Sequence, residues 1–131
     1  MKKHSSGFTV IEIIFVAVIA SVVSVLFFMQ KNNLEIVASD NTKKTAINAM
    51  YYSLEEVFYP KNGYYPQTIS SNNINTIDPA LFTDTSGVKI NTEGSSYTYT
   101  PTNCIDNKCK SYTLKATLDN EDDFVKTSKN N

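Results

Sequence analysis

The sequence predicts an α+β fold, in which a long N-terminal helix, transmembrane in its first part and amphipathic in its second, packs on a small antiparallel sheet of three or four strands. One observation behind this prediction is that 18 of the 22 residues in 8–29 are apolar. A helical repeat of apolar residues then continues to about residue 59, and from residue 88 the repeat changes to the two-residue alternation of strands.

The composition excludes several function classes. The 131-residue chain has 12 basic residues, all of them Lys, and 13 acidic residues, which give a formal net charge of −1. A near-neutral chain without Arg lacks the basic face of a dedicated nucleic-acid-binding protein, so we expect no nucleic-acid partner for the isolated domain. Nucleophile–base pairs, phosphate loops and metal-ligand motifs are absent from the sequence. We therefore expect a protein that is not an enzyme, with no catalytic residues, metal site or cofactor.

Residues 8–29 are expected to form a transmembrane helix in contact with lipid. A helix of 22 residues reaches about 33 Å, enough to cross a bilayer core of about 30 Å. Lys2 and Lys3 precede this segment closely, whereas only Lys31 follows it at once. The positive-inside rule therefore predicts a single-pass protein of the cytoplasmic membrane, with a cytoplasmic N-terminus and an extracytoplasmic globular domain at 30–131.

Two simpler interpretations of the same segment stay open. A cleavable secretory signal normally has an apolar region of about 7–15 residues, which is shorter than 8–29. A plain anchor needs only apolar length, and the chain would then be a membrane-anchored extracellular binding or adhesion domain that does not polymerise.

A more specific pattern lies at the N-terminus, which reads Lys2-Lys3-His4-Ser5-Ser6-Gly7-Phe8-Thr9-Val10-Ile11-Glu12. This pattern closely resembles the class III leader of type IV pilins and pseudopilins, in which a short basic peptide, Gly and Phe precede a Glu at the start of an apolar helix. The resemblance implies that residues 1–7 are a leader peptide. It also implies that a prepilin peptidase cuts between Gly7 and Phe8, and that the new amine of Phe8 is methylated.

The resemblance further implies a structural subunit of a type IV pilus-like filament. Such a subunit assembles with identical or related pilin subunits, with the help of the filament assembly machinery, and becomes extracellular after assembly. Residues 8–29 would then also be the polymerisation helix. Within the filament, the carboxylate of Glu12 would pair with the Phe8 amine of a neighbouring subunit.

Glu12 is the one ionisable residue between Phe8 and Met29. Carboxylates inside membrane spans are costly and mark functional positions by default. A first-turn acid that interacts with the helix dipole is the alternative interpretation of Glu12 alone. That alternative does not account for Gly7 and Phe8 directly before the apolar segment, or for the basic prefix.

The helix is expected to continue beyond the membrane to about residue 59. Its apolar positions recur at helical intervals, namely Leu34, Val37, Ile47, Met50, Leu54, Val57 and Phe58. The opposite, polar side is expected to hold Lys43, Lys44, Asn48, Glu55 and Glu56. A bend or fray is expected at 40–42, where the sequence is Asp-Asn-Thr, and Pro60 with Gly63 is expected to end the helix.

The second half of the domain is expected to be mainly strands. Asp78 as N-cap and Pro79 at the first helical position predict one short helical turn. The alternation of apolar and polar residues predicts strands at Val88–Ile90, at Ser96–Thr100 and over 112–118. The tail after Val125 is expected to be frayed.

Cys104 and Cys109 lie between the last two predicted strands. Two Cys in an exported domain predict a disulfide across the end of the hairpin, with free thiols as the alternative. Two Cys alone are too few for zinc, because the one His of the chain, His4, is in the leader. The acidic run 119–123 is either a calcium-binding loop or, more commonly for such runs, a solvated turn.

Overall fold

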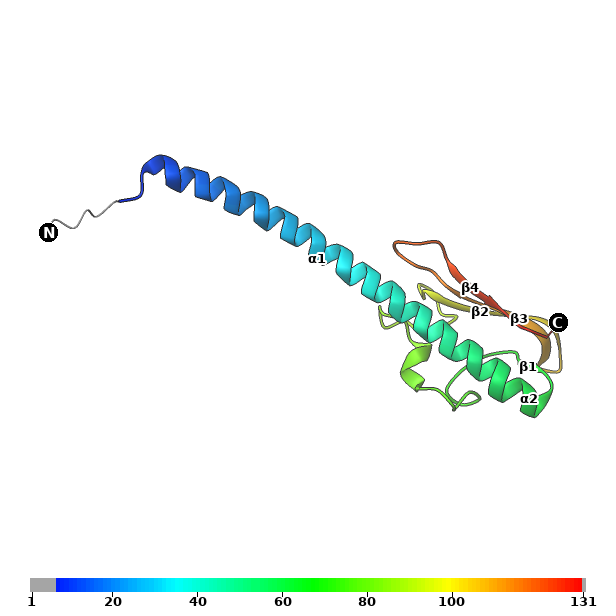
Figure 1. Cartoon of the computed structure of the whole chain (residues 1–131). Coiled ribbons are helices and arrows are strands. Elements are labelled where there is room, and N and C mark those ends of the chain that lie inside the picture. Colours follow the sequence, from blue (N-terminus) through cyan, green and yellow to red (C-terminus); the bar gives the residue numbers. More distant parts are fainter. Residues whose placement is uncertain (1–6, 131) are drawn as a thin grey trace. The chain divides into compact units, whose positions relative to one another are not determined.

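The structure is a computed structural model and describes residues 7–130 (Figure 1). One helix runs from Val10 to Asn62 and consists of α1 (Val10–Tyr52), a π-helical segment η1 (Ser53–Phe58) and a last turn α2 (Tyr59–Asn62). The chain divides into two compact units between Glu35 and Ile36. Lys2, Lys3 and the rest of the leader up to residue 6 lie outside the described residues, and the predicted boundaries at 7/8 and 29/30 stay predictions.

The described part of the first unit, residues 7–35, contains the apolar part of α1. All these residues are exposed, because no other described residue of the unit packs against the helix. This helix is long and apolar enough to cross a membrane. Length and composition therefore agree with the predicted span.

The second unit contains a four-stranded antiparallel sheet. Its strands are β1 (Tyr65–Pro66), β2 (Tyr97–Ile105), β3 (Lys108–Ala116) and β4 (Phe124–Thr127). The central strand is β3, with β2 along one edge and with β1 and β4 paired to its two ends. The predicted α+β fold, with a long N-terminal helix and a small antiparallel sheet, is confirmed.

The core of the second unit lies between the helix and the sheet. The helix contributes Ala46, Ile47, Met50 and Leu54. The sheet contributes alternate residues of its two long strands, Tyr97 and Tyr99 from β2 and Tyr112, Leu114 and Ala116 from β3. The amphipathic stripe is therefore confirmed from Ala46 to Leu54, whereas Leu34, Val37 and Val57, which were also expected on it, are exposed.

The helix differs from the prediction at two places. At 40–42 it continues without a break, because the buried carboxylate of Asp40 accepts hydrogen bonds from the backbone N–H groups of Asp119 and Asn120. At Pro60 it continues as well. A proline ring conflicts with the i→i−4 pattern of an α-helix, and the preceding π-helical turns widen that pattern. The helix ends at Gly63, whose φ of 75° is the left-handed conformation that glycine tolerates.

Of the two short elements predicted between the helix and β2, the helical turn is present and the strand is not. The turn after Asp78 is confirmed, since residues Pro79–Phe82 form a 3₁₀ helix and the Asp78 side chain accepts the N–H of Ala80 at 2.9 Å. The strand predicted at Val88–Ile90 is wrong, because only an isolated bridge between Thr83 and Lys89 occurs there.

The buried carboxylate of Asp84 explains why no strand forms at 88–90. It accepts the backbone N–H groups of Ser86, Val88 and Ser96, so the segment wraps around this side chain. The prediction of a frayed tail is also wrong. Residues Phe124–Thr127 form β4, which pairs with residues 113–116 of β3.

Candidate functional site

The start of the apolar helix holds three of the predicted functional residues, Gly7, Phe8 and Glu12. Thr9 directly precedes the first helical residue, and the Oε2 atom of Glu12 accepts both the Thr9 N–H at 2.9 Å and the Thr9 hydroxyl at 3.0 Å. This is the Glu half of a capping box, which satisfies a donor at the helix N-terminus. The Oε1 atom of Glu12 has no hydrogen-bond partner among the residues that the structure describes.

The apolar helix presents its side chains on all sides. Phe8 is 80% exposed, and the large apolar residues that follow are each about half to three-quarters exposed. The hydroxyls of Ser21 and Ser24 donate to the carbonyls of Val18 and Ala20 at 2.7 and 2.8 Å, so their polar atoms are satisfied within the helix. An apolar surface of this extent requires lipid or other protein to cover it.

The predicted disulfide between Cys104 and Cys109 is present. The two Cys were expected in the connection between two strands, but they lie within the strands themselves. Both β2 and β3 extend beyond them, and the ladder pairs Cys104 directly with Cys109. The hairpin closes through the two residues Asp106 and Asn107, whose φ angles of 50° and 64° are those of a type I′ turn. Ile105, beside this turn, is 73% exposed.

The hairpin has an irregularity that explains the burial of Cys109. The ladder between β2 and β3 omits the pair Asn103–Lys110, and Asn103 has a φ of 53°. Buried residues in β3 lie at even positions from Tyr112 to Ala116, but at the odd position Cys109 on the other side of this irregularity. Residue alternation along the sequence cannot reveal such a change of face.

The carboxylate of Glu55, which was expected on the polar side of the helix, is buried in the π-helical segment η1. Glu55 is 5% exposed and accepts the hydroxyl of Tyr65 at 2.9 Å, the hydroxyl of Tyr112 at 2.8 Å and the backbone N–H of Lys129 at 3.2 Å. Burial, and next the hydrogen bond to Glu55, raises the pKa of Tyr112. Glu55 therefore joins the helix, the sheet and the tail in one hydrogen-bonded network.

Glu55 was expected on the polar side of the helix because a regular α-helical period was assumed. In the structure, the π-helical turns change the angle between successive side chains at this point. Pro60, which follows the π-helical segment, was the available signal of an irregular helix.

A second buried ionic group joins α1 to the segment after β3. Asp40 is 1% exposed and Lys43 is 3% exposed, and the Lys43 ammonium lies 2.8 Å from Asp119 and 3.8 Å from Asp40. The backbone N–H of Asp119 is the main cause that holds the pKa of Asp40 below its ordinary value of 3.8. Lys43, like Glu55, was expected on the exposed side.

The acidic run 119–123 is largely paired with lysines. Besides the pair of Asp119 with Lys43, Glu121 lies 2.5 Å from Lys44 and Asp123 lies 3.0 Å from Lys115. Within residues 7–130, no group of three or more His, Cys, Asp or Glu side chains is arranged to hold a metal ion.

Comparison of the chain with protein-family models, with curated proteins and with solved structures finds no match. The architecture itself, one long apolar N-terminal helix followed by a small antiparallel sheet, is pilin-like. The functional interpretation therefore depends on this architecture and on the leader pattern.

Proposed function

We propose that this chain is a prepilin or pseudopilin, a structural subunit of a type IV pilus-like filament. The observation that carries the proposal is the fully exposed apolar helix that begins at Val10, two residues after Phe8, and contains Glu12 in its first turn. A plain anchor requires the apolar helix but neither the Gly–Phe junction nor the acid.

The proposed assembly moves the apolar helix from lipid into a bundle of like helices. Cleavage after Gly7 creates an amine on Phe8, four residues before Glu12 in the same chain. The two oxygens of this carboxylate can serve different partners, because Oε2 already accepts the Thr9 donors and Oε1 is left for a neighbour. The proposed donor to Oε1 is the Phe8 ammonium of an adjoining subunit. Without this carboxylate, that ammonium would be buried in the apolar bundle with no counter-charge.

The proposal includes the route of the chain. The subunit enters the cytoplasmic membrane with its N-terminus on the cytoplasmic side, and residues 30–131 lie outside. Prepilin peptidase then removes residues 1–7 and methylates Phe8. The assembly machinery incorporates the processed subunit into an extracellular filament.

One observation favours a second candidate, a membrane-anchored binding or adhesion domain that does not polymerise. The bonds from Thr9 to Glu12 cap the helix within one chain, and a monomeric anchor would benefit from the same cap. The two candidates differ in whether the N-terminus is processed and in whether filaments form.

The decisive experiment is co-expression of the full chain with a prepilin peptidase, followed by intact-mass measurement of the membrane fraction. We expect a chain that lacks residues 1–7 and carries one added methyl group at Phe8. A Gly7→Val variant is the control and should keep the full mass, because a branched side chain at the junction obstructs the peptidase. If the unsubstituted chain still contains Lys2 and Lys3, the proposal is wrong.

A further inference from the structure

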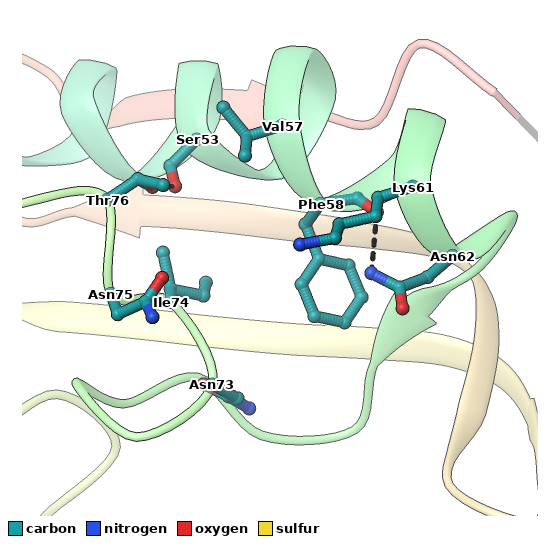
Figure 2. A pocket seen from close by; sticks show the side chains of 9 residues that line it. All are labelled: Ser53, Val57, Phe58, Lys61, Asn62, Asn73, Ile74, Asn75 and Thr76. Atoms are coloured by element: carbon teal, nitrogen blue, oxygen red, sulfur yellow. Dashed lines mark hydrogen bonds between the residues drawn. The ribbon is translucent and has the colours of Figure 1, made fainter.

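A hollow in the second unit lies between the end of the helix and the loop after β1 (Figure 2). Its volume is about 250 Å³. In Figure 2, the Phe58 ring and the Lys61 side chain extend from the helix into this space, and Ile74 and Asn75 face it from the loop. The hollow thus combines an aromatic ring, an ammonium group and a side-chain amide.

The walls of the hollow are fixed by hydrogen bonds. The hydroxyls of Ser53 and Thr76 bond to each other and join helix to loop. The amide of Asn73 donates to the carbonyl of Thr68 at 2.5 Å and accepts the N–H of Ser70 at 2.9 Å, which sets the shape of the loop. The site is therefore formed before any ligand arrives, which lowers the entropic cost of binding.

Several polar groups that line the hollow are unused. Among the residues that the structure describes, neither the Lys61 ammonium nor the Asn75 amide has a hydrogen-bond or ion-pair partner. Asn62 donates through Nδ2 to the carbonyl of Phe58 at 2.8 Å, and its Oδ1 remains available as an acceptor. One cation, one acceptor and one amide that both donates and accepts thus surround the same apolar floor.

A second hollow of about 480 Å³ has Phe58, Asn62 and Asn73 in its lining as well. The second hollow adds the ring of Tyr64 and the amide of Gln67. We call the two adjoining hollows the groove; each is lined by an aromatic residue and by residues with side-chain amides.

We propose that this groove binds a short acidic oligosaccharide, with a sugar carboxylate on the Lys61 ammonium. Amide side chains both donate and accept, as sugar hydroxyls do, and the rings of Phe58 and Tyr64 suit the C–H faces of sugar rings. This proposal goes beyond the proposed filament function and does not depend on it.

The test is a titration of the ¹⁵N-labelled full chain in detergent micelles, followed by the shifts of its amide NMR signals. Trigalacturonate is the probe, maltotriose is its neutral counterpart, and triglutamate controls for charge alone. We expect trigalacturonate to bind with a dissociation constant of about 1 mM, since a shallow polar site gives weak affinity. The dissociation constants of maltotriose and triglutamate should each be at least about fivefold higher than that of trigalacturonate.

Two variants locate the site. Lys61→Gln should weaken trigalacturonate binding about fivefold, the usual effect of an exposed ion pair, and Asn75→Ala should weaken it by about the same factor. Lys89→Gln is the matched control. Lys89 is also exposed, its ammonium has no ion-pair or hydrogen-bond partner within residues 7–130, and it lines neither hollow. The proposal is overturned if trigalacturonate causes no signal shifts at a concentration 10 times the expected dissociation constant. It is also overturned if triglutamate binds as tightly as trigalacturonate, or if Lys61→Gln changes the affinity for trigalacturonate no more than Lys89→Gln does.

Discussion

Glu12 and Glu55 lie on one continuous helix but in opposite surroundings. Glu12 is in the first unit, where no other element that the structure describes packs on the helix. Within residues 7–130, the partners of its carboxylate are two donors of Thr9, three residues away. Glu55 is in the second unit, where it is buried and bonded to donors from β1, β3 and the tail. One carboxylate has capacity to spare, and the other is fully used inside its own chain.

This difference separates an intermolecular role from an intramolecular one. A carboxylate with an unused oxygen on an uncovered helix can still gain a partner from outside the chain. A carboxylate with three internal donors contributes to the stability of the fold instead. The two residues are therefore expected to fail in different assays when they are changed.

The largest expected effect is on assembly in Glu12→Gln. The amide keeps the shape of the side chain but removes the counter-charge for the Phe8 ammonium, and the penalty recurs at each subunit contact. We expect the yield of sheared filaments, relative to membrane-inserted subunit, to fall at least about tenfold. Membrane insertion should be unchanged or better, because an amide is less costly in lipid than a carboxylate. A normal filament yield would reduce Glu12 to a helix cap.

The next effect is on stability in Glu55→Ala. Removal of the carboxylate leaves two buried tyrosine hydroxyls and one backbone N–H without their acceptor, so we expect a loss of at least about 3 kcal/mol in the free energy of unfolding. The measurement is urea unfolding of the full chain in detergent, followed by tyrosine circular dichroism. Glu56→Ala is the matched control. Its exposed ion pair with Lys129 should contribute less than about 1 kcal/mol. Equal losses in the two variants would contradict the network.

A smaller effect is expected when the disulfide is removed by the double change Cys104→Ser and Cys109→Ser. Opening so short a loop should lower the free energy of unfolding by about 2 kcal/mol in the chain-entropy model. The same unfolding experiment, with and without a reductant, measures it. Reductant should destabilise the unchanged protein and leave the double variant unaffected. Filament yield should be less sensitive than in Glu12→Gln, because the hairpin belongs to the second unit.

The smallest expected effect is a change of pH dependence in Asp40→Asn. The folded-state pKa of Asp40 is held below its ordinary value of 3.8, mainly by the N–H of Asp119. The carboxylate therefore contributes stability above about pH 4, and this contribution is lost as the pH falls through the folded pKa. We expect the variant to be less stable than the unchanged protein at pH 7 and to approach it near pH 2. A constant difference across this range would exclude ionisation of Asp40 as the cause.

The sequence was sufficient for those features that repeat or stand alone. The apolar run at 8–29, the helical stripe from Ala46 to Leu54 and the alternation in β3 each recur over enough residues to identify an element. The disulfide was predictable because the chain has only two Cys, and they are close together. These features depend on local spacing, which the sequence displays directly.

The sequence was insufficient where distant residues decide the outcome. Glu55 and Lys43 look like members of a solvated helix face, and their burial depends on Tyr112 and Asp119, which lie far along the chain. Likewise, β4 forms because β3 leaves an edge for it to pair with, and its own residues give a weak strand signal. Residue spacing cannot show which side chains a turn brings back to the helix.

The network around Glu55 also has a consequence for biosynthesis. The acceptor is synthesised first, and its donors follow in the order Tyr65, Tyr112 and Lys129. A nascent chain that has exposed only the helix and β1 holds a carboxylate that must stay hydrated, because burying it would leave it undersatisfied. The second unit can therefore reach its final packing only after the residues around Lys129 have left the ribosome or the translocation channel. The core therefore closes only after the tail has been synthesised. By that time the apolar helix, which is synthesised first, has already reached the membrane on the proposed route.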